Sequence, residues 1–408
     1  MAFVKQILVI GSEGNSIETE LGSDFGFGGD LDKIGMDMSF NLPYVKFNED
    51  ASGVDLTRLK KFDTAKLYYG EFETNPGDIG LSNLNLVFDG FIDNITLSKS
   101  KDSISYAISC FSTILLPRKL ERTTEEVKYV EDAINTLLQL GGVQDGEAAV
   151  LATIDLFPPS MIRYIDIDAQ DLLVKLSGDE ELVGALKKIT QNYAINIYQS
   201  GDGYLNIVTP TQILQSGGDL AFNAWEFKID ENMWSLDYGN IVNDINGVVC
   251  LGRPPDVMGQ AIDPIGVQLN AGSGVTPGPQ HYNYLTIQRR DLIDTESCQK
   301  VARNELLNIL KNYVVTFTTK FDYRYRLGQP VTIYDNDRYP DGKIFFIKSY
   351  RVSLSKDSVV CTIVAYASSI TQLPEDLVID SDGITDVDNL DITYETQNTI
   401  GWGDGGFE

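Results

Sequence analysis

The sequence predicts a mainly β protein of the α+β class, in which two related β domains flank a small α+β domain and are followed by an acidic C-terminal arm. Three observations support this prediction. The chain has 408 residues, more than one hydrophobic core usually supports. It contains 20 Tyr, 18 Phe and 36 Gly, a balance typical of β-rich globular proteins. One hairpin motif also occurs twice, near the ends of the two β regions.

The first predicted β domain covers residues 1–118. Strands are expected at 3–10, 66–70, 84–97 and 102–111, the last because apolar and small polar residues alternate along it. The Gly-rich stretch 22–29 is predicted to be a loop. Because it follows no clear strand and begins no helix, a phosphate-binding role is not expected for it.

Residues 119–220 are predicted to form the small α+β domain. A capping pattern at Thr123 and Glu126, followed by apolar residues at helical spacing, predicts a helix that ends before Gly141. Ser177 and Glu180 begin a second predicted helix. Two strands follow it, over 194–198 and 204–208 on either side of a Gly-Asp-Gly turn.

The second predicted β domain covers residues 221–370 and includes one helix over 295–312. Its other elements are strands at 245–251, 314–321, 330–334, 343–354 and 358–366, with a Pro/Gly-rich exposed loop at 252–279. The arm covers residues 371–408, and its part from 375 holds ten acidic residues and no basic one. Such a segment cannot bury a stable core alone, so its scattered apolar residues are expected to bind a partner: Ile392, Tyr394, Ile400, Trp402 and Phe407.

The charge balance excludes a protein that binds DNA through its phosphates. Asp and Glu number 59 against 32 Lys and Arg, for a formal net charge of −27. This acidity could repel a nucleic acid that slides past, or it could serve solubility alone. No apolar run approaches the length of a membrane span or of a signal-peptide core, so we expect a protein made and kept in a cytoplasm.

No catalytic, cofactor-binding or metal site is expected. Cys110, Cys250, Cys298 and Cys361 lack the spacing of a zinc site or a disulfide framework, and the single histidine, His281, lies in a predicted loop. The acidic stretches 335–342 and 380–388 lack EF-hand spacing and are interpreted as polar turns. Paired carboxylates for glycoside or peptidoglycan cleavage stay open, because sequence does not give their separation in space.

The repeated motif consists of a strand, a turn rich in Ser, Lys and Asp, and an alternating strand. It runs from Phe91 through Leu97-Ser98-Lys99 to Phe111, and again from Phe346 through Leu354-Ser355-Lys356 to Tyr366. Two unrelated amphipathic hairpins can have similar sequences, because only a few residue types are common in turns. Duplication is nevertheless the better interpretation. Three chains with two such domains each would present six to a sixfold tube.

Four segments, in this order, resemble the baseplate hub family of contractile-tailed phages, which includes the late-control-D-type proteins. They are residues 86–93 (LVFDGFID), residues 182–207 with their Asp-Gly turn, residues 243–249 (NDINGVV) and residues 327–333 (LGQPVTI). The motifs are soft, and their order carries the resemblance, which covers most of residues 1–370. Gln329 departs from the Asp that the family often has at this turn.

The resemblance implies two tube-type β-barrel domains and a structural, non-enzymatic homotrimer in the baseplate of a virion tail, assembled in the host cytoplasm. Its expected partners are the tail tube protein, a separate spike protein and other baseplate proteins, with DNA only as a passing cargo. The alternative is a siphophage-like tail-tip protein on the same scaffold, and a tail-associated wall hydrolase is third. A phage-derived bacteriocin or injection system is not distinguished from a phage.

Overall fold

The computed structural model describes the parts of the chain that form its main sheet and most of its smaller elements. The described residues are 3–11, 17–20, 25–43, 59–73, 80–99, 104–116, 126–129, 162–164, 173–176, 182–193, 196–208, 225–240, 245, 247–252, 258–262, 284–289, 292, 295–309, 313–355 and 358–367. His281 and the acidic arm, with the five residues predicted to bind a partner, lie outside them.

The N-terminal part of the chain forms seven strands of one antiparallel arrangement, in the order β3-β4-β7-β6-β5-β1-β2. The strands are β1 (Phe3–Gly11), β2 (Ile17–Glu20), β3 (Phe25–Asp30), β4 (Asp37–Pro43), β5 (Thr64–Phe72), β6 (Asn85–Lys99) and β7 (Ile104–Ser112). Short 3-10 helices at Leu81–Asn83 and Thr113–Leu115 flank β6 and β7. We call this part the first unit.

The C-terminal part forms a second unit with the strand order β14-β18-β21-β20, to which β19 and β13 are added beside β20. Its strands are β13 (Trp225–Lys228), β14 (Met233–Asn240), β18 (Tyr313–Lys320), β19 (Pro330–Asp335), β20 (Tyr339–Ser355) and β21 (Ser358–Ala367). The predicted strands at 314–321, 330–334, 343–354 and 358–366 are therefore present, and β20 begins four residues earlier than predicted.

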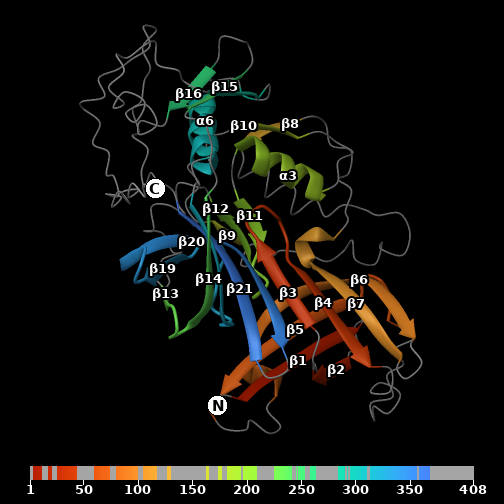
Figure 1. Ribbon diagram of the computed structural model, residues 1–408. Helices are drawn as coiled ribbons and strands as arrows, with labels where there is room; N and C mark the ends of the chain where they lie inside the picture. Colours follow the sequence, from red (N-terminus) through yellow and green to blue (C-terminus); the bar gives the residue numbers. More distant parts are fainter. Residues whose placement is uncertain are drawn as a thin grey trace.

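The two units share one thirteen-stranded sheet, because β20 of the second unit pairs with β3 of the first. Figure 1 shows the blue β20 and β21 lying beside the red β3 and β4. The prediction of a loop at 22–29 was wrong for residues 25–30, which form β3. The high glycine content of this segment did not make it a loop, because it pairs with a strand more than three hundred residues away in sequence.

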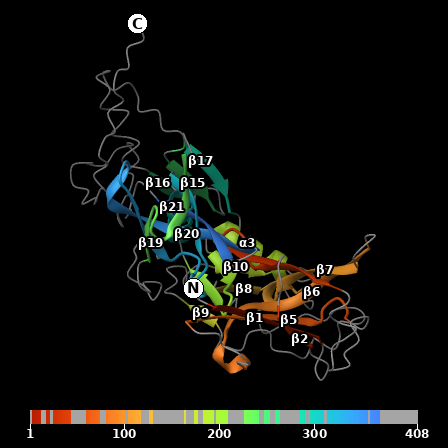
Figure 2. The same cartoon turned by 60° about the horizontal axis from the view of Figure 1, so that its bottom comes forward.

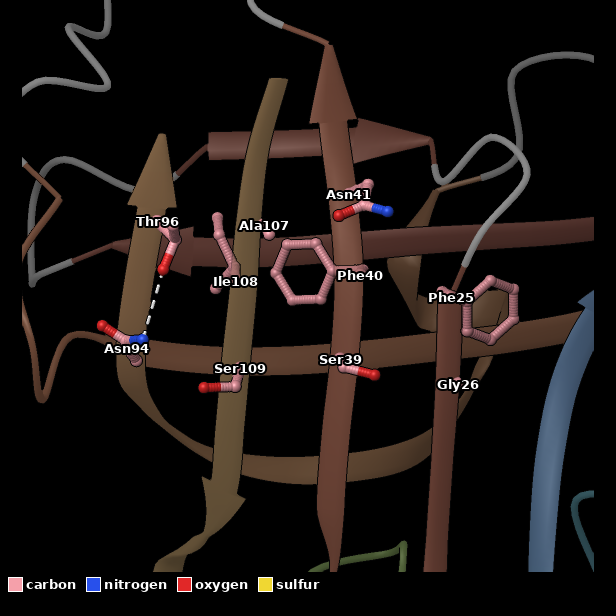
Figure 3. A pocket seen from close by; sticks show the side chains of 10 residues that line it. All are labelled: Phe25, Gly26, Ser39, Phe40, Asn41, Asn94, Thr96, Ala107, Ile108 and Ser109. Carbon is pink, nitrogen blue, oxygen red and sulfur yellow. Dashed lines mark hydrogen bonds between the residues drawn. The ribbon is translucent and has the colours of Figure 1, made fainter. Parts of the chain in front are cut away.

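In the first unit the sheet folds back on itself, so that β1 and β5 cross behind β3, β4, β7 and the C-terminal half of β6 (Figure 3). Apolar side chains fill the space between, including Leu8, Leu67, Phe27, Phe40 and Ile108. The strands form because their apolar residues recur every second position, which directs one face of each strand into this core.

The middle of the chain forms small elements that lie against the sheet. They are β8 (Glu126–Tyr129), β9 (Ile162–Tyr164), β10 (Leu173–Leu176), α3 (Leu182–Tyr193), β11 (Asn196–Gln199) and β12 (Leu205–Val208). The second predicted helix and the two strands after it are present, with α3 beginning five residues after Ser177. The first predicted helix was wrong at residues 126–129, where β8 pairs with β10; the rest of that helix lies outside the described residues.

A further sheet of three strands, in the order β16-β15-β17, packs against helix α6. Figure 2 shows these three green strands grouped together. Its elements are β15 (Gly247–Leu251), β16 (Met258–Ile262), β17 (Tyr284–Gln288) and α6 (Thr295–Ile309). Strand β16 corrects the prediction of a loop over 252–279, at residues 258–262. The described part of the chain contains no helix both long and apolar enough to cross a membrane.

Candidate assembly surface

The two units contain the same four-stranded arrangement. In the first unit the order is β3-β4-β7-β6, and in the second it is β14-β18-β21-β20. The registers agree as well as the order. Phe91 pairs with both Phe111 and Thr64, and Phe346 likewise pairs with both Tyr366 and Pro330, so that β5 and β19 take equivalent places beside β6 and β20.

The hairpins β6–β7 and β20–β21 also share an irregularity. A bulge interrupts the first between Ile92 and Asn94, and the second between Ile347 and Ser349, two places that the register makes equivalent. Bulges are specific features that are kept when a strand is duplicated. The equivalence continues to the hairpin turns, where the sequence Ser-Lys-Asp-Ser occurs at 100–103 and at 355–358. It therefore equates Leu97 with Val352, two residues away from the match that the sequence motif suggested.

The two units meet where the C-terminal half of β20 pairs with β3, and we call this contact the internal junction. Arg351 lies opposite Gly28, and Val352 lies opposite Phe27. A Cβ added to Gly28 would lie 2.4 Å from the Tyr350 carbonyl oxygen and 3.1 Å from the Arg351 Cα. Because no side chain fits in that space, the junction requires glycine at position 28.

Aromatic side chains from both units form one core beneath the internal junction. Phe321 of the second unit makes edge contacts with Phe27 and Tyr69 of the first, with ring centroids 5.4 and 5.1 Å apart. On the other face of the sheet, Arg351 reaches across Gly28 to Asp37, with an Nη1–Oδ2 distance of 2.9 Å. The two units are therefore held as one body by main-chain pairing, by aromatic packing and by an ion pair.

Strand β11 of the middle segment contacts both units. The Gln199 amide donates to the Asp89 carbonyl oxygen and accepts from the Ile114 N–H, both in the first unit. The neighbouring Tyr198 hydroxyl donates to the Leu327 carbonyl oxygen in the second unit, at 2.9 Å. Both side chains are buried, so these hydrogen bonds satisfy polar groups that would otherwise be costly. The middle segment thus fixes the angle between the units.

The opposite side of the shared sheet from the core presents small polar side chains. One row of cross-strand neighbours runs over seven strands, through Lys320, Val360, Ser353, Gly26, Ser39, Ser109 and Asn94. This row and its neighbours on the same side form what we call the polar sheet face, whose other members include Ser235, Asp237, Gly239, Val314, Thr316, Thr318, Thr362, Val364, Ser349, Arg351, Gly28, Asp30, Asp37, Asn41, Ala107 and Thr96.

The polar sheet face is close to neutral although the chain is strongly acidic. Its charged members are Asp37 and Arg351, which pair with each other, Lys320, which pairs with Glu71, Asp237, and Asp30, which lies opposite Ser349. Three acids against two bases leave a small net negative charge on the face, compared with −27 for the chain. The face has neither the basic cluster that holds phosphate nor the apolar patch that marks a hydrophobic interface.

A shallow hollow of about 400 Å³ lies on this face in the first unit. Figure 3 shows its polar side chains on neighbouring strands: Asn94 and Thr96 from β6, Ser109 from β7, and Ser39 and Asn41 from β4. The Asn94 side chain donates to the Thr96 hydroxyl, 3.3 Å away. Alcohols and amides alone offer no nucleophile with a base beside it and no set of metal ligands.

The described titratable groups also lack the arrangement of a catalytic site. Burial raises the pKa of the Cys110 and Cys361 thiols above their ordinary value, so both remain neutral packing groups. Asp335, the last residue of β19, accepts from the Tyr238 hydroxyl and from the Asp337 N–H. The predicted polar turn at 335–342 is present at 336–338, and it was wrong for residues 339–342, which begin β20. No group of three potential metal-ligating His, Cys, Asp or Glu side chains occurs within the described ranges.

Sequence analysis missed the residues on which the junction depends. Gly28 was assigned to a loop, and its counterpart Gly239 was not singled out. They could have been found from their equivalent positions in the two repeated arrangements. The β3–β4 and β14–β18 registers make Gly28 and Gly239 equivalent, because Phe40 and Phe317 occupy the same place beside Ile108 and Ile363.

Comparison with family models finds no match, and comparison with curated proteins finds none either. Solved structures do match along nearly the whole chain. The tail protein from Neisseria meningitidis MC58 aligns with a TM-score of 0.58 and 14% identity, covering 89% of this chain and 96% of that one. The 43 kDa tail protein of prophage MuSo2 from Shewanella oneidensis aligns with a TM-score of 0.58 and 11% identity, covering 89% and 98%.

A third similar structure is the prophage tail protein gp18 from Listeria monocytogenes, with a TM-score of 0.50, 8% identity and coverage of 88% and 94%. At such low identities the likeness concerns the fold. It extends over both units and the middle segment, as the coverage values require. The chain therefore has the fold of phage tail proteins, in agreement with its resemblance to the baseplate hub family.

Proposed function

We propose that this protein is a structural, non-enzymatic hub subunit of a phage tail baseplate or a related contractile injection system. In this role three copies form a ring that joins the tail tube to a separate spike protein and surrounds the passage for DNA. The observation that carries the proposal is the internal junction, at which two equivalent four-stranded arrangements already meet edge to edge within one chain.

The repetition fits a subunit that adapts one symmetry to another. A ring of three chains with two equivalent units each offers six similar positions to a sixfold tube, and threefold positions to a spike. The middle segment and the β15–β17 sheet with α6 have no second copy among the described elements. They are the parts that can distinguish one unit from its neighbour.

The polar sheet face supports the passage role. Small alcohols, amides and glycines dominate this face, and its two named cations, Arg351 and Lys320, already pair with carboxylates rather than with a phosphate. Its net charge is small, so DNA should neither bind to it nor meet a strong barrier. A wall of this kind suits a polymer that passes through without stopping. The apolar residues of the arm remain our candidates for contact with the spike.

Localisation in purified particles tests the proposed function. Antibody labelling and mass spectrometry should find this chain at the baseplate end of tails, and native mass spectrometry of the purified chain should give a trimer. A chain found along the tail shaft, or absent from tails, would contradict the role. Localisation at the tip of a tail that lacks a sheath would instead support the tail-tip alternative.

The passage role has its own test in a matched pair of substitutions. Ser39→Lys places one cation per copy on the polar sheet face, whereas Ser82→Lys places it on the exposed 3-10 helix before β6. We expect particles carrying Ser39→Lys to release DNA more slowly in an ejection assay, because the added lysines attract phosphates. Ser82→Lys particles should behave as wild type. If both kinds of particle released DNA at the same rate, the polar sheet face would not line the DNA passage.

A further inference from the structure

Each of the two equivalent four-stranded arrangements has an edge that the described chain leaves open. In the second unit, β14 pairs with β18 on one side only. In the first unit, β5 pairs with β6 up to Phe91, and the described residues of the C-terminal half of β6, from Asn94 onwards, pair with β7 alone. Unpaired main-chain N–H and C=O groups on a strand edge are a template for another strand.

The internal junction shows what these two edges can form. The hairpin registers make β6 equivalent to β20, and the outer-strand registers make β14 equivalent to β3. The open half of β6 is thus the counterpart of the half of β20 that pairs with β3. The open edge of β14 is the counterpart of the covered edge of β3.

We propose that β6 of one copy pairs antiparallel with β14 of a second copy of this chain, in the register of the internal junction. Thr96 then lies opposite Gly239, Leu97 opposite Tyr238, and Ser98 opposite Asp237, as Arg351, Val352 and Ser353 lie opposite Gly28, Phe27 and Gly26. This inference deepens the proposed ring, on which it rests, by naming the contact that closes it.

Gly239 supports the pairing independently of the open edges. Glycine within a strand is unfavourable unless something approaches its backbone closely. Among the described residues nothing does, because an added Cβ would lie 3.6 Å from the Val314 carbonyl oxygen and 3.8 Å from its Cβ, which are ordinary contacts. At the equivalent Gly28, the strand across the junction forbids a side chain. A second copy on β14 gives Gly239 the same reason to be glycine.

Leu97 gives a second sign of a missing neighbour. Its side chain is 43% exposed, whereas the equivalent Val352 is fully buried at the internal junction. The residue that covers Val352 from across the junction is Phe27, and Tyr238 is the equivalent residue of β14. Pairing with a second copy therefore covers an apolar side chain that the single chain leaves in solvent.

A pair of cysteines tests the register directly. Ser98→Cys with Asp237→Cys places two thiols opposite each other across the proposed contact, and copper phenanthroline supplies the oxidant that joins them. The matched control, Ser98→Cys with Ser235→Cys, moves one thiol two residues along the same face of β14, about 7 Å away. The native cysteines Cys110, Cys250, Cys298 and Cys361 are buried and should not react.

We expect the first pair to give a ladder of linked chains on a non-reducing gel, and the control pair to give single chains. The ladder should stop at three if the ring is a trimer. A ladder that stops at another number would uphold the β6–β14 contact and overturn the trimer. A trimer by native mass that forms no ladder would overturn this contact while leaving the proposed function in place.

Gly239→Val provides a test that needs no oxidation. Valine suits a strand, and position 239 has room for it in the single chain, so the monomer should melt at the wild-type temperature. Across the contact the side chain would collide with the neighbouring backbone, so we expect at least a tenfold weaker association in analytical ultracentrifugation. The control is Gly80→Val, where an added Cβ meets nothing within 4 Å. Wild-type association by Gly239→Val would overturn the proposal.

Discussion

Strands β3 and β14 occupy the same place in two equivalent arrangements, yet one is covered and the other is open. β3 has β4 on one side and β20 on the other, whereas β14 has β18 on one side and no described strand on the other. Both carry a glycine at the same position. The comparison separates what the fold of a single chain requires from what an assembly requires.

The residues that face the core are alike in the two arrangements, unlike the sheet edges. Phe40 and Phe317 lie in the same register beside Ile108 and Ile363, and both are buried. Phe317 also packs against Phe227, with centroids 4.7 Å apart. Packing at this core position is therefore similar in the two units, whereas strand pairing differs at the sheet edges.

The largest effect should come from removing these core rings. We expect Phe40→Ala and Phe317→Ala each to lower the free energy of unfolding by about 3–5 kcal/mol, because each removes a buried ring and leaves a cavity. Chemical denaturation followed by tryptophan fluorescence measures this. Similar losses at both positions would support equivalent cores. A loss confined to one position would break the comparison.

The next effect should distinguish the two glycines. Gly28→Val places a side chain within 2.4 Å of the Tyr350 carbonyl oxygen, so β3 must move away from β20. We expect a loss of about 2–3 kcal/mol, as for an overpacked core. Gly239→Val should stay within about 0.5 kcal/mol of wild type when measured on dilute monomer. Equal losses would mean that β14 is already covered in the single chain.

A smaller effect is expected for the ion pair across the internal junction. Arg351 and Asp37 are 2.9 Å apart, and their side chains are 55% and 54% exposed. The equivalent residues, Thr96 on the open part of β6 and Val314 on β18 next to the open β14, carry no charge. We therefore expect Arg351→Met to cost no more than about 1 kcal/mol at low salt, and less at high salt. A larger loss that salt does not reduce would make the pair essential to the junction.

The smallest effect concerns the side of the first unit that the middle segment covers. Burial raises the pKa of Asp89 above its ordinary value, against an opposing contribution from Lys66, whose ammonium is 3.5 Å away. Its equivalent in the second unit, Ile344, is exposed. A raised pKa in the folded state means that stability is complete at low pH and falls as pH rises through the folded pKa.

Asp89→Asn should therefore match the wild type in acid and be more stable than it at neutral pH. Thermal unfolding across that pH range measures the difference, with Asp341→Asn at an exposed position of β20 as the control. If Asp89→Asn were less stable at neutral pH, the Lys66 pair would outweigh the cost of burial. The charged form of Asp89 would then be favoured by the fold.

How much the sequence could predict differs between local and distant interactions. The β strands at 3–10 and 358–366 and the helix α6 were predictable because periodicity and capping are local signals. Residues 126–129 were not. Their capping pattern favours a helix, and only pairing with 173–176 makes them a strand. β3 was missed for the same reason, because its glycine-rich sequence forms a strand by pairing with β20 near the other end of the chain.

The candidate surface was partly predictable. The repeated hairpin motif alone indicated two related β regions. Matching the two hairpins residue by residue also needed the positions of their bulges, which only the structure gives. The polar sheet face could not be predicted, because it is assembled from eight strands of both units whose order sequence does not give. The predicted function of the arm stays a prediction, since its residues lie outside those described.

The internal junction also sets an order of events in synthesis. β3 leaves the ribosome early and its partner β20 late, so the edge of β3 waits open while most of the chain is made. During that time it can accept β20 from another molecule, which would give a domain-swapped chain. Tethering favours the correct partner, because a segment on the same chain is present at a high effective concentration. Rapid synthesis of neighbouring copies at one site would weaken this advantage.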